Sequence, residues 1–291
     1  MSYELRVKKF THPFMQLLVL AVLSLAFFVL AVFVGAAVGM GNGGVEGSRS
    51  LFIVWQAVSQ VLMFGLPPLI VAALYYRGEA RSWLRIDFSG RRWLLALAGV
   101  VAVLLLVPLT DWLTTWNDSW HWSGAWEPAE RALRRVGEES QATVEGVMRE
   151  CHPLLNLLCM ALVPAVCEEL FFRAGVQNLL QRWFKNVHVA VWVTAALFSL
   201  AHGEVFAFLP RFLLGALLGY LYVGGRSLVV NVTVHFVNNA LVVALYWLST
   251  QGASFDPAAP LSLGWNTILA CSASAVLLLV VTFGKELKIS K

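Results

Sequence analysis

Long apolar runs separated by short polar stretches dominate this chain. A helix needs about 20 apolar residues to cross the hydrocarbon core of a bilayer. Windows of that length predict eight spans, at about residues 14–40, 51–76, 93–113, 153–172, 189–208, 211–223, 228–248 and 261–283. The first run is too long for a removable signal peptide, so we expect it to remain as a helix. The pattern predicts an all-α fold, a polytopic membrane protein with about eight transmembrane helices.

The composition agrees with a protein that lies mostly in the membrane. Of the 291 residues, 59% are hydrophobic and 13% are charged, whereas soluble domains average about 45–50% and about 25%. No repeat or low-complexity segment divides the chain, so we expect residues 1–291 to form a single membrane domain. The four cysteines lack a C-x-x-C spacing and are expected to be small buried apolar residues: Cys151, Cys159, Cys167 and Cys271.

The net charge of +4 comes from basic residues in short loops beside the apolar runs, so we expect no binding of nucleic acid. Cytoplasmic loops of membrane proteins are enriched in Lys and Arg. With the N-terminus inside, 15 of the 21 basic residues fall on the inner side: Arg6, Lys8, Lys9, Arg77, Arg81, Arg85, Arg91, Arg92, Arg173, Arg182, Lys185, Arg226, Lys285, Lys288 and Lys291. This asymmetry predicts two cytoplasmic termini, and we expect a multi-pass protein of the plasma membrane.

The longest predicted outer loop, residues 114–152, is rich in both tryptophan and acid. Four tryptophans come first: Trp116, Trp120, Trp122 and Trp126. Such rings suit the interface between membrane and water. The pattern that follows predicts a helix outside the bilayer over residues 127–150, whose acidic side chains we expect to face solvent.

Ionisable side chains interrupt the apolar runs at three places. Each costs roughly 2.5–3.5 kcal/mol at the centre of a membrane helix unless it is paired or faces a wet interior. The first place is Glu168-Glu169-x-x-x-Arg173. On a helix, Glu169 and Arg173 share a face and should neutralise each other, while Glu168 is turned away by about 100°. Glu168 is left without an evident cation, and a desolvated carboxylate suits a general base that takes a proton from water.

The other two patterns place histidines on apolar helices. His235-x-x-x-Asn239 puts an imidazole and an amide on one face, and such donors can stabilise a developing oxyanion. In Phe198-x-x-x-His202 the histidine could orient a water or carry its proton. Each pattern alone would also suit a bridge between helices. Together with Glu168 they suffice to hydrolyse an amide without a covalent intermediate, so we expect a polar intramembrane cavity.

Two neighbouring features have structural explanations. Gly215-x-x-x-Gly219 predicts close packing between helices and not a ligand site. Asn231 precedes His235 by one turn, and it could extend the polar face or make a packing hydrogen bond equally well.

The three patterns, in this order and on successive predicted helices, resemble the CPBP family, the CAAX proteases and bacteriocin-processing enzymes also called Abi proteins. The resemblance covers about residues 155–245 and includes Phe212, Gly215 and Gly219. It implies a catalytic core at 155–245 within an intramembrane glutamate endopeptidase, a hydrolase without metal or cofactor.

The resemblance also assigns roles to six residues, with Glu168 as the base, Glu169 and Arg173 as its support, His202 on the water side, and His235 with Asn239 at the oxyanion. The implied partner in the bilayer is a membrane-associated peptide or protein tail. In eukaryotic-type members this is a prenylated C-terminal tail, cut after the modified cysteine. Other members process small peptides or provide immunity to bacteriocins, so neither the substrate nor its lipidation carries over.

Three other functions stay open. His202, His235 and Glu168 could form a zinc site with an open position, although no H-E-x-x-H is present and the nearby Arg173 disfavours a dication. A non-catalytic scaffold or bacteriocin-immunity protein could bind a partner through the same cavity, but it would not need an unpaired Glu168. A transporter could use the same groups as a proton relay, and it would more often show inverted repeats.

The predicted spans place Glu168 and His202 at different depths. Glu168 would lie about 6 Å from the inner surface and His202 about 20 Å from it, at 1.5 Å per residue. A shared site therefore requires tilt, or a fourth helix that ends later than residue 172.

Overall fold

The computed structural model describes residues 12–37, 48–87, 90 and 92–288, and all regular structure in these ranges is helical. The elements are α2 (Pro13–Ala37), α3 (Arg49–Gln60), η1 (Val61–Gly65), α4 (Leu66–Tyr75), α5 (Ala80–Trp83), α6 (Arg92–Asp118), η2 (Gly124–Trp126), α7 (Glu127–Glu150), α8 (Pro153–Asn156), η3 (Leu157–Leu162), α9 (Val163–Glu168), η4 (Glu169–Gln177), α10 (Asn178–Phe184), α11 (Val187–Leu200), η5 (Val205–Ala207), α12 (Phe208–Gly225), α13 (Leu228–Thr250) and α14 (Trp265–Lys288).

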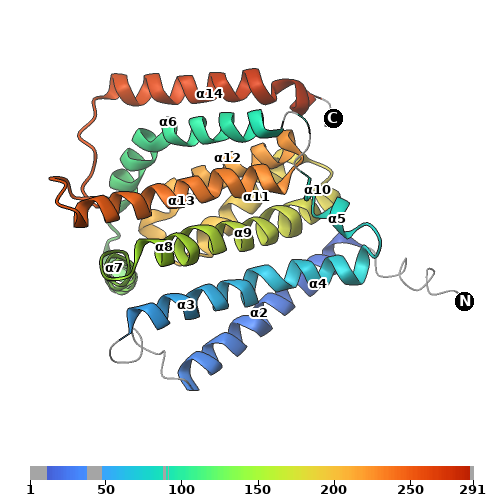
Figure 1. Cartoon of the computed structure of the whole chain (residues 1–291), viewed down its shortest axis with the longest axis horizontal. Helices are drawn as coiled ribbons and strands as arrows, with labels where there is room; N and C mark the ends of the chain where they lie inside the picture. Colours follow the sequence, from blue (N-terminus) through green and yellow to red (C-terminus); the bar gives the residue numbers. More distant parts are fainter. Residues whose placement is uncertain (1–11, 38–47, 88–89, 91, 289–291) are drawn as a thin grey trace, which may run out of the picture.

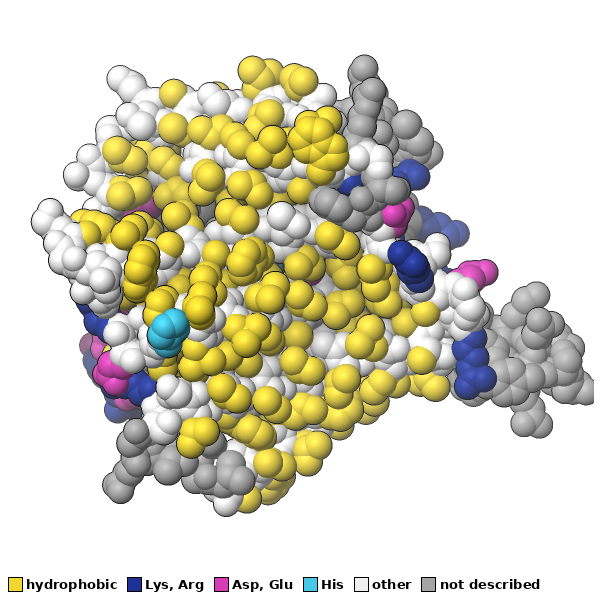
Figure 2. All heavy atoms as spheres, in the orientation of Figure 1, with side chains coloured by type: hydrophobic (Ala, Val, Ile, Leu, Met, Phe, Trp, Pro, Cys, Tyr) yellow, Lys and Arg dark blue, Asp and Glu magenta, His cyan; other side chains and the backbone are white. Residues whose placement is uncertain are grey.

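Most of these helices are suited to a bilayer. In the described part of the chain, seven are long and apolar enough to cross a membrane, and α11 is a shorter apolar helix of 14 residues. Their outer surfaces carry large exposed apolar side chains such as Phe33 and Val281. Figure 2 shows such side chains covering the long flank of the molecule. The chain is a multi-pass integral membrane protein, and the predicted all-α polytopic fold is confirmed.

Two predicted span boundaries are wrong. The helix predicted over residues 153–172 is a single rod of 32 residues that runs from α8 to the end of α10 at Phe184. Three polar residues soon after 172, Arg173, Gln177 and Asn178, resemble a membrane exit in sequence, but they are buried against other helices. The span predicted over 189–208 ends at Leu200, because a turn with Gly203 at φ +72° follows, and α12 begins at Phe208.

Several residues that were counted in the topology prediction either lie elsewhere in the structure or fall outside the described residues. Arg173 does not lie in an inner loop, because it is fully buried inside the long rod. The last residues of the first predicted span, 38–40, lie outside the described residues, as do five of the basic residues: Arg6, Lys8, Lys9, Arg91 and Lys291.

The membrane helices run roughly side by side and alternate in direction, as Figure 1 shows. The start of α2 and the end of α14 lie at one end of the bundle. Helix α7 lies across the opposite end and is seen end-on in this view. Its bounds, Glu127–Glu150, are those predicted from the sequence. Acidic residues in its first turn and Arg149 in its last complement the helix dipole, so this helix is stabilised locally.

Two helices of the bundle approach closely where the glycines were predicted to pack. A Cβ at Gly215 would lie 3.1 Å from the Cα of Ala195, and one at Gly219 would lie 2.8 Å from Cγ1 of Val191. Both contacts are with α11, so the glycines let α12 press against it. The prediction of close packing is confirmed, and it brings α11 toward the core of the bundle.

Wide π-helical turns interrupt two of the spans. The turns η1 and η3 each run into a helix that has proline at its start, Pro67 after η1 and Pro164 after η3. Proline has no N–H for the regular ladder, which favours such an irregularity. The longest wide turn, η4, begins at Glu169 and has no such proline. Wide turns of this kind are frequent at functional sites.

Candidate active site

The three polar patterns meet at one cavity of about 670 Å³ between the helices and under α7. Four of the six predicted site residues line it: Glu168, His202, His235 and Asn239. The other two, Glu169 and Arg173, are fully buried beside it. The structure therefore separates the six residues into a group at the cavity wall and a supporting pair behind the wall.

His235 lies between the two adjacent glutamates. Its Nδ1 is 3.0 Å from Oε1 of Glu169, and its Nε2 is 3.8 Å from Oε2 of Glu168. The imidazole is 2% exposed, so these two carboxylates are its charged neighbours in a nearly dry environment. A carboxylate can only accept, so Nδ1 is the donor to Glu169. The prediction that the two glutamates face different surroundings agrees with this arrangement.

Glu169 is the centre of a buried network. Its Oε2 accepts from Nε of Arg173 at 3.1 Å and from Nδ2 of Asn231 at 3.0 Å, and its Oε1 accepts from His235. The predicted pair with Arg173 is present, but the bonds to His235 and Asn231 were not predicted. Asn231 also donates to the carbonyl of Leu218, so this network ties α13 to both η4 and α12.

Arg173 also reaches the next motif through an aromatic ring. Its guanidinium carbon lies 5.3 Å from the ring centroid of Phe198, a distance at which a cation is attracted to the ring face. The same ring packs edge-on against His202 and His235, with centroids 5.0 and 5.9 Å apart. Phe198 thus connects the buried ion pair to the two histidines, which explains its place in the motif.

Glu168 stands at the end of α9 and is 5% exposed, with its side chain at the cavity wall. Nε2 of Gln60 donates to its Oε1 at 3.3 Å. This contact was missed in the sequence, although a glutamine in an apolar span is itself an unusual signal. Gln60 belongs to α3, so a fourth helix, which carries none of the three motifs, contributes to the site.

His202 and Asn239 are more open to the cavity. His202 lies in the turn after α11, is exposed, and its Nδ1 is 2.9 Å from the carbonyl of Phe198. Asn239 also lines the cavity, and its Oδ1 accepts a hydrogen bond from Nδ2 of Asn238. Asn238 also lines the cavity and was not predicted.

The mismatch in depth between Glu168 and His202 disappears in the structure. The rod continues for 16 residues after Glu168, which corresponds to about 24 Å at 1.5 Å per residue. His202 lies 15 residues after the start of α11, or about 22 Å. The two residues are therefore at similar heights, and the predicted end of the fourth helix at residue 172 caused the discrepancy.

One face of α7 forms the roof of the cavity, through residues that include Val136, Glu139, Ser140 and Thr143. Ser140 donates to Glu204, and Glu204 pairs at 2.5 Å with Arg211, which lines the cavity. The predicted solvated helix is thus also part of the site. No sequence motif marks these contacts.

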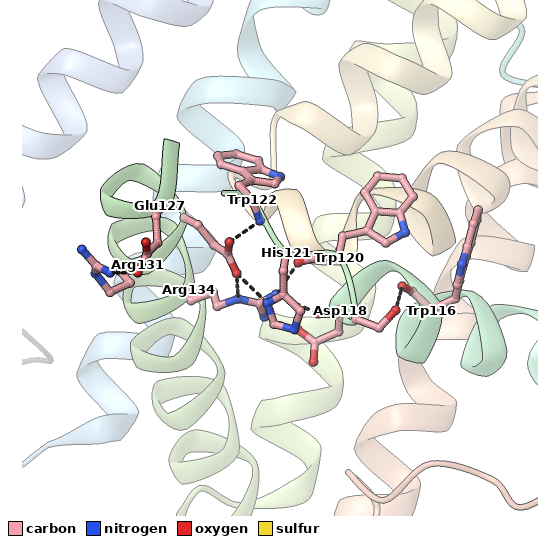
Figure 3. Close-up of polar contacts among 10 residues, drawn as sticks. Trp116, Asp118, Trp120, His121, Trp122, Glu127, Arg131 and Arg134 are labelled. Carbon is pink, nitrogen blue, oxygen red and sulfur yellow. Dashed lines mark hydrogen bonds and ion pairs between the residues drawn. The ribbon is translucent and has the colours of Figure 1, made fainter. Parts of the chain in front are cut away.

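The start of α7 is fastened to the end of α6. Figure 3 shows Arg134 reaching Asp118 and Trp120, with Nη1 2.8 Å from Oδ1 of Asp118 and Nη2 2.7 Å from the carbonyl of Trp120. Glu130 accepts from Nε of Arg134 and from the N–H of Trp122. These hydrogen bonds, the one from Arg134 first, lower the pKa of Glu130 to about 2. The contacts that hold the start of α7 to the end of α6 therefore involve ionised groups at neutral pH.

Within the residues that the structure describes, no three His, Cys, Asp or Glu side chains are arranged to hold a metal ion. The zinc set considered for His202, His235 and Glu168 thus has no assembled geometry there.

Comparison with known proteins supports the same segment of the chain. Residues 150–241 match the model of the Rce1-like family, described as type II CAAX prenyl endopeptidase Rce1-like. No curated protein and no solved structure matches the chain. The matched segment contains all three motifs, and the resemblance drawn from them is confirmed. Residues 150–241 are therefore similar to a family of CAAX-type intramembrane proteases, hydrolases that act on membrane-associated peptides.

Proposed function

We propose that this protein is an intramembrane glutamate endopeptidase in which Glu168 activates the attacking water. The observation that carries the proposal is the position of Glu168, at the wall of the cavity and 3.8 Å from Nε2 of His235. A water molecule that bridged these two atoms would be held by a base on one side and by an imidazole on the other. Proton transfer to a positioned carboxylate contributes typically about 10²–10⁴-fold to such a reaction.

Glu169 and Arg173 are proposed to position His235 and to balance its charge. Because Nδ1 carries a proton toward Glu169, a second proton on Nε2 makes His235 an imidazolium. Two carboxylates, one guanidinium and one imidazolium then sum to zero charge, which makes their burial tolerable. In this state the Nε2–H can donate to the oxyanion that forms when water attacks the scissile carbonyl.

Asn239 and His202 are proposed to act on the cavity side of the same reaction. The amide of Asn239 is one helical turn from His235, so both can donate toward one point in the cavity. His202 is exposed and can exchange protons with solvent near the leaving amine. Water addition and proton return to the amine complete the hydrolysis, with no metal or cofactor in the scheme.

The substrate is proposed to be a membrane-associated peptide or protein tail, and a lipidated tail fits the site. A second hollow of about 200 Å³ lies between α2 and α3, and it shares Gln56 and Gln60 with the main cavity. Apart from Ser59, the rest of its lining is apolar and includes Phe28 and Val32. A chain segment or lipid in the bilayer can therefore approach Glu168 from the side of α3.

We further propose one membrane domain over residues 1–291 with a catalytic core at 155–245, both termini in the cytoplasm, and residence in the plasma membrane. The family match at 150–241 supports the limits of the core. The basic residues at the end of the bundle where α14 terminates support the orientation.

The test is a comparison of membrane peptides from cells that contain the normal protein, the Glu168→Gln variant or the Glu138→Gln variant. Glu138 is exposed on α7 and does not line the cavity, so Glu138→Gln is the matched control. We expect one or more peptides to be cut in the normal and control cells but to stay intact with Glu168→Gln. Unchanged cleavage with Glu168→Gln would contradict the proposed base.

Activity of the purified protein after chelation is the second measurement. The glutamate mechanism predicts unchanged activity, because a carboxylate and not Zn²⁺ activates the water. Loss of activity that zinc restores would favour the zinc alternative.

A further inference from the structure

We propose that a second large cavity, which shares no lining residue with the candidate active site, binds a phosphate group. This basic cavity has a volume of about 670 Å³ and lies beside α5, at the end of the bundle opposite α7 (Figure 1). Its charged lining consists of four arginines and two carboxylates: Arg81, Arg85, Arg92 and Arg226, with Glu79 and Asp87. The excess of positive charge suits an anion, and the proposed hydrolysis uses none of these residues.

Segments that are distant in the sequence build the basic cavity. Two of its arginines belong to α5 and the turn after it, a third is the first residue of α6, and Arg226 stands between α12 and α13. Hydrogen bonds hold the first and last segments together. The N–H of Leu228 donates to the carbonyl of Arg85 at 3.0 Å, and the hydroxyl of Ser227 donates to the carbonyl of Asp87. The cluster of arginines is therefore a product of the tertiary structure.

Two of the four arginines also have structural contacts. Arg92 pairs with Asp87. Arg85 donates from Nη1 to the carbonyl of Tyr222 at 3.3 Å, and its guanidinium carbon lies 4.6 Å from the centroid of the Tyr222 ring. A guanidinium has five N–H donors in a planar fork, so Arg85 keeps donors for a ligand after making these contacts.

The other two arginines, Arg81 and Arg226, are exposed and have no carboxylate partner among the described residues. Nε of Arg81 donates to the carbonyl of Ile86, and the side chain of Arg226 makes no hydrogen bond there. Arginines near α7 differ, because these pair with carboxylates: Arg49, Arg131, Arg134, Arg149 and Arg211. An unpaired guanidinium can bind phosphate oxygens through two parallel hydrogen bonds.

Two further observations indicate a ligand at the basic cavity. Arg85 and Arg226 have left-handed backbones, with φ of +54° and +48°, which side chains with a Cβ rarely adopt. Such strain is frequent at sites that hold ligands. Gln181 of α10 also lines the cavity, and its Nε2 is buried with no hydrogen-bond partner in the described structure. A phosphate oxygen would satisfy this donor.

The position of the basic cavity favours a membrane lipid as the source of the phosphate. Gly78 follows the end of α4, Arg92 begins α6, and Val223 lies near the end of α12. Ends of membrane helices lie at the level of the lipid headgroups. Basic pockets between such helices bind anionic headgroups. A soluble phosphate compound offers the same chemistry, and the experiment distinguishes these two sources.

The test measures binding of phosphatidylglycerol and phosphatidylcholine, at equal concentrations, to the purified and delipidated protein by native mass spectrometry. Arg81→Gln with Arg226→Gln removes the two exposed arginines of the cavity. Arg131→Gln with Arg149→Gln is the matched control, because it removes the same charge from α7. We expect the normal and control proteins to prefer phosphatidylglycerol. The cavity variant should bind it roughly 10- to 30-fold more weakly, at about 1 kcal/mol for each arginine.

Inorganic phosphate is titrated in parallel, with the melting temperature as the readout. Stabilisation by phosphate that the cavity variant loses, without a preference for phosphatidylglycerol, would support the phosphate site and identify a soluble source. Equal binding by the normal protein and the cavity variant would overturn the proposal. An equal loss in the control, or no binding of either probe, would also overturn it.

A single substitution keeps the test decisive if the double cavity variant fails to fold. Arg226→Gln removes an exposed side chain that has no partner in the described residues, so its folding should be normal. Binding of the preferred probe should weaken about 5-fold. Unchanged binding would overturn the proposal. These measurements do not depend on catalysis, so their outcome is separate from that of Glu168→Gln.

Discussion

Two Glu–Arg pairs with the same spacing, Glu169–Arg173 in the membrane rod and Glu130–Arg134 on α7, behave as different structures because their surroundings differ. Both are i, i+4 pairs with a contact from Nε of the arginine, at 3.1 and 2.8 Å. The first pair is 0% exposed. In the second pair, 22% of the Arg134 side chain is exposed. Helical spacing brings the charges together in each case, and burial decides how much stability is lost when the contact is broken.

The partners of the two pairs differ in the same way. Glu169 is surrounded by Arg173, His235 and Asn231, and all four side chains are buried away from bulk water. Arg134 instead binds backbone carbonyls and Asp118 at the surface and covers the ring of Phe206. The buried pair lies behind the wall of the candidate site, whereas the outer pair holds α7 against the end of α6.

The largest effect on stability should come from breaking the buried pair. Glu169→Gln leaves the Arg173 guanidinium without its countercharge, and loss of one partner of a buried pair costs about 3–5 kcal/mol. We expect a large fall in the melting temperature in detergent. Replacing both residues, as Glu169→Gln with Arg173→Met, should recover part of the loss, and a double variant that was no more stable than Glu169→Gln would argue against an electrostatic cause.

The largest effect on turnover should come from the neighbouring residue. Glu168→Gln is nearly isosteric and removes the proton acceptor, so we expect a loss of about 10²-fold or more. Its melting temperature should stay near that of the normal protein, because Gln60 can still bind a side-chain oxygen there. Peptide turnover and melting are measured on both glutamate variants in the same detergent. A stable, inactive Glu169→Gln beside an unstable, active Glu168→Gln would reverse the roles.

A smaller effect is expected at the outer pair. Glu130→Gln should lower the melting temperature less than Glu169→Gln does, because solvent can replace part of the interaction with Glu130 that Arg134 loses. Proteolysis of the segment between α6 and α7 should become faster as the fastening weakens. A fall in melting temperature as large as that of Glu169→Gln would show that exposure does not separate the two pairs.

The outer pair also predicts a dependence on pH. The pKa of Glu130 is lowered from 4.5 to about 2 by the Arg134 and Trp122 hydrogen bonds. A carboxyl with a depressed folded-state pKa stabilises fully above its unfolded value, and this contribution is lost as pH falls from about 4.5 toward 2. The difference in melting temperature between the normal protein and Glu130→Gln should therefore shrink between about pH 6 and about pH 3. A difference that grew on acidification would have the wrong sign.

The smallest effect is expected at an exposed pair on the same helix. Arg131 and Glu127 also form an i, i+4 pair, but their side chains are 64% and 56% exposed. Such pairs contribute about 0–1 kcal/mol, so Arg131→Met should change the free energy of unfolding by no more than about 0.5 kcal/mol. Chemical denaturation measures this change, and a larger loss would mean that Arg131 has a further partner in function or folding.

The features predicted correctly from the sequence are those set by neighbours along the chain. The bounds of α7 follow from its charge pattern, and the pairing of Glu169 with Arg173 follows from helical spacing. The close helix packing at Gly215 and Gly219 follows from their missing side chains. The three motifs also indicated the cavity, because ionisable groups in apolar runs need a shared polar interior.

The features that were missed depend on helices far apart in sequence. Gln60 meets Glu168 across 108 positions, and Ser140 meets Glu204 across 64. The true end of the fourth helix was missed for a related reason. Hydropathy cannot distinguish a polar residue at the membrane surface from one buried inside a bundle, and Arg173 is of the second kind.

The sequence by itself determined that this chain crosses the membrane repeatedly, where ionisable side chains interrupt its apolar runs and which of these side chains share a helical face, because hydropathy and helical periodicity act over one or two turns. Only the tertiary structure decided that His235 lies between two carboxylates and that α7 roofs the cavity. Those facts depend on how several rods pack together, and the buried network around Glu169 is held by contacts between helices that no local pattern specifies.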